Sequence, residues 1–293
     1  MDRVYRLAHL SDPHLAPPAL PIELSKRALS ALSWRMKRRH RHLSWVVEAL
    51  TTDLLQQAPD HIAVTGDLTN FGTEAEFRAG ADWLGGLGRP EAVSFVPGNH
   101  DAMVASAWPR GQAVLAPYCT GDDGAMGMPW LRRRGGLALI GVSSAVATVP
   151  FSAAGALGPA QVDRVWALLR QTREEGLCRV LLIHHPPGEG VIARKALRDR
   201  AALCAVMARE GTELVLHGHL HRAALGSVLG PDGPIPLIGA PSASMRPRGH
   251  EDAGAWRMLA ISRAATGWRM TLVERGLDAS RAVVERARFE IVL

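Results

Sequence analysis

The amino-acid sequence predicts an α/β protein, in which helices cover the faces of a β-sheet. Short apolar runs recur along the chain, and helical patterns lie between them. The composition agrees, because a chain of 293 residues that is 47% hydrophobic and 21% charged can bury a large core. A disordered or fibrous protein is excluded.

Seven apolar runs are typical of buried strands, and each ends at a polar cluster. The predicted strands cover residues 4–10, 61–65, 92–96, 137–142, 179–183, 213–216 and 235–240. Helical patterns lie between them at residues 44–57, 73–84, 159–175 and 193–210. Strands and helices thus alternate along the chain, as in an α/β fold.

The C-terminal part of the chain has a different pattern. Residues 256–262 and 268–274 alternate apolar and polar side chains on either side of a turn at Thr266 and Gly267. Residues 288–293 add a further strand pattern. We therefore expect antiparallel strands over residues 255–293, within the same domain as the rest of the chain.

The net charge of +6 comes from one segment, because residues 26–41 hold seven basic side chains and no acidic one. The balanced remainder gives no reason to expect a specific nucleic-acid partner. The three cysteines are far apart and lack metal-ligand spacing, so we expect reduced thiols. The N-terminus shows charged residues and no apolar signal segment. We expect a cytoplasmic protein, with peripheral contact to a membrane left open.

Five polar clusters follow the predicted strands and hold the residues with metal-binding or catalytic chemistry. The carboxyl ends of strands in an open α/β sheet meet at one crevice, so we expect the clusters to converge there. One site built from residues 12 to 221 needs one domain, which we place over residues 1–293. The clusters are Asp12-Pro13-His14, Gly66-Asp67, Gly98-Asn99-His100-Asp101, His184-His185 and His217-Gly218-His219-Leu220-His221.

The side chains of these clusters are carboxylates, an amide and imidazoles. This set suits divalent manganese, iron or zinc, whereas calcium prefers oxygen ligands alone. Two neighbouring metal ions need a ligand that touches both, and a carboxylate with two oxygens can do so. The clusters therefore predict a site for two divalent metal ions.

The order of the motifs, D-x-H, G-D, G-N-H-D, H and G-H-x-H, resembles that of the calcineurin-like metallophosphoesterases. The resemblance implies a four-layer α/β/β/α sandwich with a binuclear metal centre, in which a hydroxide bridging the metal ions attacks the phosphorus. His100 would be the catalytic residue, as general acid or electrostatic stabiliser. The implied ligands are Asp12, His14 and His221 for one metal ion, Asn99, His184 and His219 for the other, and Asp67 for both.

Residues 66–72 depart from the G-D-x-x-D-R-G pattern of the protein phosphatases in this superfamily. Asn70 stands in place of the second Asp, and Phe71 stands in place of the Arg. The missing Asp would orient His100, and the missing Arg would clamp a phosphate dianion. A diester carries one charge fewer, so the sequence resembles the phosphodiesterase branch, which includes bacterial cyclic-nucleotide phosphodiesterases.

The sequence therefore predicts a metal-dependent hydrolase of a phosphodiester or pyrophosphate bond, with a cyclic nucleotide or another small diester favoured as substrate. Asn70 and His185 are the predicted substrate-binding residues. One alternative is a lipid pyrophosphatase of the UDP-diacylglucosamine type that works at a membrane surface. An alternative of another class is a non-catalytic metal-binding scaffold, although no ligand position is lost.

The remaining polar residues have predicted roles outside the ligand set. His185 is expected to line the pocket rather than to bind a metal ion, and His9 and His217 are expected to pack in the interior. Asp101 can either orient His100 or cap backbone groups, and the sequence favours neither. The histidines expected at the surface are His40, His42, His61 and His250.

Residues 22–43 are predicted to form a basic helical cap, inserted after the first metal motif and close to the mouth of the site. With about 3.6 residues per turn, the apolar side chains form one stripe, and Trp34 lies among basic residues on the opposite side. A tryptophan among arginines suits an anionic membrane interface. The alternative is a solvated helix over the crevice, with Trp34 packed on a neighbouring loop. The stripe comprises Leu24, Ala28, Leu29, Leu32, Met36 and Leu43, and the opposite side comprises Arg27, Trp34, Lys37, Arg38 and Arg41.

Overall fold

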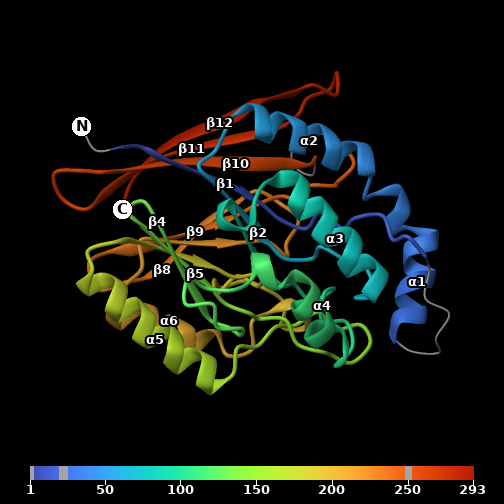
Figure 1. Ribbon diagram of the computed structural model, residues 1–293, viewed down its shortest axis with the longest axis horizontal. Coiled ribbons are helices and arrows are strands. Elements are labelled where there is room, and N and C mark those ends of the chain that lie inside the picture. The colour runs from blue at the N-terminus through green and yellow to red at the C-terminus, as the bar shows by residue number, and fades with distance from the viewer. Residues whose placement is uncertain (1–2, 20–25, 248–252) are drawn as a thin grey trace.

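The computed structural model describes residues 3–19, 26–247 and 253–293. Two six-stranded sheets pack face to face, and helices cover the outer face of each sheet (Figure 1). These four layers confirm the expected α/β/β/α sandwich. Within the described part of the chain, no helix is long and apolar enough to cross a membrane.

The first sheet has the strand order β12-β11-β10-β1-β2-β3. Its parallel strands are β1 (Tyr5–Leu10), β2 (His61–Thr65) and β3 (Val93–Val96). Their nearly continuous apolar sequences fit strands that are buried on both faces. The antiparallel strands are β10 (Ala255–Arg263), β11 (Trp268–Leu277) and β12 (Val283–Val292). Because β10 pairs with β1, the C-terminal strands extend the sheet that the N-terminal strand begins.

The second sheet has the strand order β4-β5-β6-β7-β9-β8, with antiparallel strands only at its edges. The parallel strands β5, β6, β7 and β9 match predicted runs, whereas the edge strands β4 and β8 were not predicted. β4 contains three consecutive arginines, and Gly226 and Ser227 interrupt the apolar residues of β8, so neither has a continuous apolar run. The strands are β4 (Trp130–Arg134), β5 (Leu137–Gly141), β6 (Cys178–Leu182), β7 (Leu214–His217), β8 (Ala224–Leu229) and β9 (Pro234–Gly239).

The helices form the outer layers, with α2 and α3 on the first sheet and α5 and α6 on the second (Figure 1). The α-helices are α1 (Lys26–Met36), α2 (Ser44–Gln56), α3 (Glu74–Leu87), α4 (Ala107–Leu115), α5 (Pro159–Glu174) and α6 (Arg200–Glu210). Short 3-10 helices are η1 (Arg38–His40), η2 (Pro90–Ala92), η3 (Ala116–Tyr118) and η4 (Ala193–Lys195).

The side chains of β6 show how the layers pack. Val180 and Leu182 point into the core that joins the two sheets, and Leu181 points into the core beneath α5 and α6. This alternation follows from the two-residue period of a strand. Burial of each such side chain stabilises the fold by about 1.5–3 kcal/mol.

The helix predicted over residues 193–210 is two pieces, η4 and α6. The carboxylate of Asp199 accepts hydrogen bonds from the backbone N–H groups of Leu157 and Gly158, at 2.8 Å and 2.7 Å. These bonds hold the chain between the two pieces against the loop that precedes α5. Helical periodicity carries no information about such a tertiary contact, so the prediction was wrong there.

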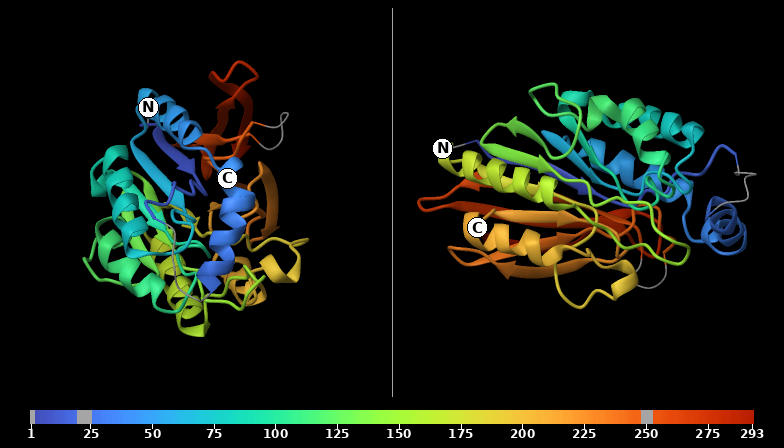
Figure 2. Two further views of the ribbon diagram at one scale, coloured as in Figure 1. Left: turned by 90° about the vertical axis from the view of Figure 1, so that its right-hand side faces the viewer. Right: turned by 90° about the horizontal axis from the view of Figure 1, so that it is seen from below.

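The cap helix α1 lies at the end of the sandwich toward which β1 runs (Figure 2). Leu32 and Met36 of the predicted apolar stripe are 57% and 64% exposed. The opposite side faces the protein, because the ring of Trp34 lies 6.5 Å from that of Phe71 and the guanidinium of Arg27 donates to the Phe71 carbonyl. Trp34 therefore packs on a neighbouring loop, as in the second of the two alternatives for the cap.

Candidate metal centre

The candidate ligands lie in the loops that follow β1, β2, β3, β6 and β7, where both sheets end. The backbone is strained there, since five of the eight non-glycine residues with positive φ in the described residues are candidate ligands. Each such conformation costs about 1–3 kcal/mol, and strain of this kind collects at functional sites. The strained ligands are Asp12, His14, Asp67, His219 and His221.

The first ligand cluster consists of Asp12, His14, Asp67 and His221, whose donor atoms lie within 4.8 Å of one another. Nε2 of His221 lies 3.1 Å from Oδ1 of Asp12 and 3.3 Å from Nε2 of His14. Nε2 of His14 lies 3.7 Å from Oδ2 of Asp67. Two imidazole nitrogens that face each other among carboxylates need a proton or a metal ion between them, so this cluster is built for a cation.

The second cluster gathers Asp67, Asn99 and His219 around His184, and one nitrogen each of His184, His185 and His219 lies within 4.8 Å of the others. Nε2 of His184 lies 3.3 Å from Oδ1 of Asn99 and 3.6 Å from Oδ1 of Asp67. The ring centroids of His184 and His219 are 5.1 Å apart. The structure thus gathers all seven candidate ligands into two adjoining clusters that share one carboxylate.

Asp67 turns one carboxylate oxygen toward each cluster. Oδ2 faces His14, and Oδ1 faces His184 while accepting the backbone N–H of His100 at 2.8 Å. Burial raises the pKa of Asp67 to about 7, and the nearby carboxylate of Asp12 acts in the same direction. Two cations beside this carboxylate would offset both effects, as a bridging ligand requires.

The free donor atoms fit divalent metal ions. Oδ2 of Asp12 accepts the hydroxyl of Ser11 and the backbone N–H of His219, at 2.6 Å and 3.0 Å. In the described part of the chain, Oδ1 of Asp12 and Nε2 of His219 are buried without a hydrogen-bond partner. Nδ1 of His184 donates to the Thr65 carbonyl at 2.7 Å, which leaves the lone pair of Nε2 for a metal ion. Buried polar atoms of this kind are costly unless a partner satisfies them.

His100 lies beside the first cluster, with its ring centroid 5.0 Å from that of His14. Its Nδ1 lies 2.9 Å from the carbonyl oxygen of Asn70. A carbonyl only accepts, so Nδ1 carries the ring proton. The backbone of Asn70 therefore orients His100 where the sequence pattern would place an aspartate side chain.

The two residues predicted to bind substrate are both buried. The side chain of Asn70 donates to the Leu15 carbonyl at 2.7 Å, and its Oδ1 has no partner among the described residues. Nε2 of His185 donates to the carbonyl of Ala153 at 3.0 Å, and Nδ1 lies 2.7 Å from the hydroxyl of Ser144. Both ring nitrogens of His185 are thus engaged, although the ring lies near His184. Substrate contact by either residue stays a prediction.

Asp101 caps the backbone of the neighbouring loops. Its carboxylate accepts the backbone N–H groups of Gly98 and Thr69, at 2.8 Å and 2.9 Å. No hydrogen bond joins it to the ring of His100 among the described residues. Of the two alternatives that the sequence left open, the structure supports the capping role.

Two histidines expected at the surface lie inside instead. His61 is fully buried at the start of β2, with Nε2 2.8 Å from the hydroxyl of Ser94. His42 is half-buried, with Nδ1 2.8 Å from the hydroxyl of Ser244 and its ring centroid 4.3 Å from that of His14. The surface prediction was wrong for both, because tertiary packing covers them.

The other histidines are placed as expected where the structure describes them. His9 and His217 are buried, and Nε2 of His9 lies 2.9 Å from the hydroxyl of Thr65. His40 is exposed. His250 and Leu24 lie outside the described residues.

Sequence reasoning missed two residues that the cap brings to the centre, Arg38 and His42. Nη2 of Arg38 lies 3.2 Å from Nδ1 of His14, and His42 could join His14 and His221 around a metal ion. Neither residue follows a strand, so no motif marks it. The only signal in the sequence is the position of the cap directly after the first metal motif.

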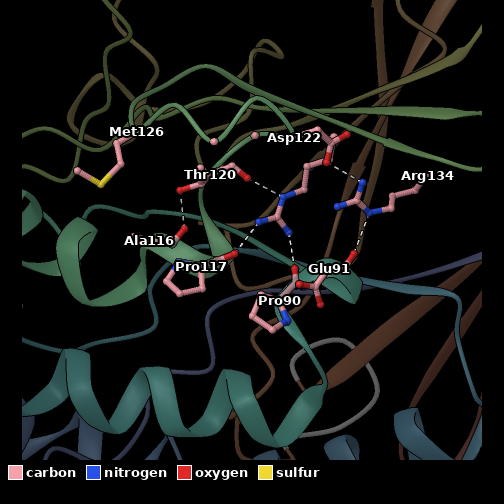
Figure 3. A pocket seen from close by; sticks show the side chains of 11 residues that line it. Pro90, Glu91, Ala116, Pro117, Thr120, Asp122, Met126 and Arg134 are labelled. Carbon is pink, nitrogen blue, oxygen red and sulfur yellow. Dashed lines mark hydrogen bonds and ion pairs between the residues drawn. The ribbon is translucent and has the colours of Figure 1, made fainter.

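A separate surface pocket of about 500 Å³ lies beside β4, and none of its lining residues is a candidate ligand (Figure 3). Arg132 and Arg134 are among the residues that line it. Arg132 donates to four backbone carbonyls, and Arg134 pairs with Asp122 at 2.8 Å. These guanidinium groups serve the fold, which leaves the two ligand clusters as the candidate site.

Comparisons with known proteins agree with this arrangement. A probable cyclic nucleotide phosphodiesterase of Synechococcus sp. is 28% identical over 217 residues, which cover 73% of this chain and 76% of that protein. A dimetal phosphatase of Danio rerio is similar in structure, with a TM-score of 0.61, 13% identity and 99% of both chains covered. A purple acid phosphatase from yellow lupin (Lupinus luteus) also has a TM-score of 0.61 and 13% identity, covering 100% of this chain and 54% of its own. The sequence model of the calcineurin-like phosphoesterases matches residues 5–223, and the chain belongs to this family.

Proposed function

We propose that the protein hydrolyses a small phosphodiester, such as a cyclic nucleotide, at a centre of two divalent metal ions. The observation that carries the proposal is the pair of ligand clusters that share Asp67, whose two oxygens lie 3.7 Å and 3.6 Å from His14 and His184. One carboxylate between two clusters suits two neighbouring cations, which in turn suit an anionic substrate. The name of the Synechococcus relative supports the same reaction.

The residues of the chain have separate roles in this reaction. Divalent metal ions, when bound, activate water and polarise phosphoryl oxygens. Thr65 and Asp67 hold the second cluster in place, through the hydrogen bond to His184 and the shared carboxylate. His100 is the proposed proton-transfer residue, since the Asn70 carbonyl fixes its orientation beside the first cluster.

The preference for a diester rests on position 71. Phe71 stands where the related protein phosphatases have arginine, and its side chain is fully buried against Trp34. This position therefore supplies no cation to the site. A monoester carries more negative charge than a diester near neutral pH, so the missing cation weakens monoester binding more.

Hydrolysis by the manganese-loaded protein tests the proposal. We expect a higher kcat/KM for bis-p-nitrophenyl phosphate than for p-nitrophenyl phosphate, and hydrolysis of cyclic AMP. Asp67→Ala, which removes the shared carboxylate, is the inactive control. A clear monoester preference would refute the diesterase proposal. Two bound metal ions without hydrolysis of any phosphoester would favour the non-catalytic scaffold.

A lipid-bearing substrate is a second candidate, because apolar side chains are exposed on and beside the cap. Leu32 and Met36 lie one turn apart on α1 and are 57% and 64% exposed. Val149 and Phe151 are 73% and 86% exposed. Nζ of Lys26 donates to the backbone carbonyls of residues 148 and 152, so α1 begins beside the loop that holds Val149 and Phe151.

Exposed cations on the cap accompany these side chains: Arg35, Lys37, Arg39 and Arg41. Apolar side chains that enter the headgroup region and cations that meet anionic lipid are the features of interfacial binding. We therefore propose that this face can dock on an anionic lipid surface and present the centre to a substrate of the UDP-diacylglucosamine type. Each cation near the surface would contribute about 1 kcal/mol.

Co-sedimentation with phosphatidylglycerol vesicles tests this second candidate. We expect binding that weakens as salt rises and is absent from phosphatidylcholine vesicles. Leu32→Ser combined with Phe151→Ser should reduce binding, whereas Leu229→Ser, at an exposed apolar residue in β8, should not. Equal binding to neutral vesicles, or no binding at all, would rule out this docking.

A further inference from the structure

Arg38 carries a guanidinium from the cap into the candidate metal centre. It begins η1, directly after α1. Its Nη2 lies 3.2 Å from Nδ1 of His14, and its Nη1 lies 3.4 Å from Nδ1 of His100. A side chain from the inserted segment thus reaches one metal ligand and the proposed proton-transfer residue together.

Neither imidazole nitrogen can accept a hydrogen bond from Arg38 when the centre holds metal. His14 faces Asp67 through Nε2, so its Nδ1 carries the ring proton whenever Nε2 binds a metal ion. Nδ1 of His100 gives its proton to the Asn70 carbonyl. A guanidinium has five N–H donors and no acceptor, so both contacts place a donor against a donor.

The arginines Arg132 and Arg179, which the fold buries, have acceptors, whereas the half-buried Arg38 differs from them. Arg132 donates to four carbonyls, two of them from Pro90 and Pro117 (Figure 3). Arg179 pairs with Glu213 at 2.7 Å. Among the described residues Arg38 forms no direct ion pair, although the carboxylates of Asp67, Glu76 and Asp12 favour its charge from farther away. A half-buried guanidinium without a direct anionic partner leaves donors unsatisfied, which favours an anion beside it.

We propose that Arg38 is a substrate-binding residue, which donates to the non-bridging oxygens of a phosphoester at the metal centre. The inference rests on the proposed function. The planar fork of a guanidinium matches two phosphate oxygens. The cap would thereby supply the cation that Phe71 does not, and one guanidinium matches the single charge of a diester.

Binding of inorganic phosphate to the manganese-loaded protein tests the assignment, measured by titration calorimetry together with metal content. We expect Arg38→Gln to lose about ten- to hundredfold in phosphate affinity while keeping both metal ions. Its KM for bis-p-nitrophenyl phosphate should rise to a similar extent. Arg38→Lys, which keeps the charge but not the fork, should recover part of the affinity. Arg170→Gln, at an exposed arginine paired with Glu174 on α5, is the matched control.

Two results would overturn the assignment. Unchanged phosphate affinity in Arg38→Gln would mean that the guanidinium does not meet the anion. Loss of a metal ion in the same variant would make Arg38 a positioning residue for His14. A wild-type protein that holds two metal ions and binds no phosphate would contradict the proposed function instead, so the two failures are distinguishable.

Discussion

Gly98 allows the loops after β2 and β3 to touch, and Gly98→Ala tests whether this contact positions the shared carboxylate. A Cβ at residue 98 would lie 2.3 Å from Oδ1 of Asp67 and 2.8 Å from Cε1 of His184. Ordinary contacts begin at 3.4 Å, so Asp67 would have to move by about 1 Å. A displacement of this size at a reacting centre costs about a hundredfold in rate. Overpacking also lowers the free energy of unfolding by about 1–3 kcal/mol.

The assay compares kcat on bis-p-nitrophenyl phosphate, metal content and urea unfolding of the metal-free protein. Gly86→Ala is the matched control, because a Cβ at this exposed position of α3 meets nothing within 4 Å. It should raise the free energy of unfolding by up to about 1 kcal/mol and leave the metal content unchanged. A folded Gly98→Ala protein with two metal ions and full turnover would refute the reasoning.

Asp67→Ala should empty both metal positions, whereas Asn99→Ala should spare the first cluster; equal metal losses in elemental analysis would contradict the shared role of Asp67. His100→Gln should lower kcat by about a hundredfold at constant metal content, and a loss of metal ions would instead make His100 a ligand. Burial lowers the pKa of His61 to about 3, so below pH 6.5 the unfolded chain takes up a proton that the folded chain does not. The free energy of unfolding should therefore fall by about 1.4 kcal/mol per pH unit from pH 6 to pH 4, and urea titrations of His61→Gln should lack this share of the slope.

The parallel strands and the residues after them could be predicted because both follow from one local rule. An apolar run ends where the chain leaves the sheet, and a polar residue placed there lies at the shared edge. β2 occupies the predicted residues 61–65, and Asp67 follows it. β6 lies within one residue of its predicted range, and His184 follows it. The position of a polar residue directly after a predicted strand was thus enough to identify it as a candidate ligand.

The cap and the edge strand β4 could not be read in this way. Helical periodicity gives the angle between side chains, but it does not say which side meets the rest of the protein. Leu32 therefore lies in solvent while Arg38 enters the centre. A search for apolar runs misses β4 because it contains Arg132. This arginine can be buried only because the folded chain supplies backbone carbonyls that accept its hydrogen bonds. Both cases depend on partners far away in the sequence.

The ligands come from both halves of the sandwich, with four after strands of the first sheet and three after strands of the second. Ions held between Asp67 and His184 would therefore act as a cross-brace between β2 and β6, which do not pair with each other. Metal binding to the folded chain would raise the free energy of unfolding by about 4 kcal/mol when the free metal concentration exceeds the dissociation constant a thousandfold. Removal of the ions by a chelator would then speed amide hydrogen exchange along whole strands, including residues far from any atom that touches the ions.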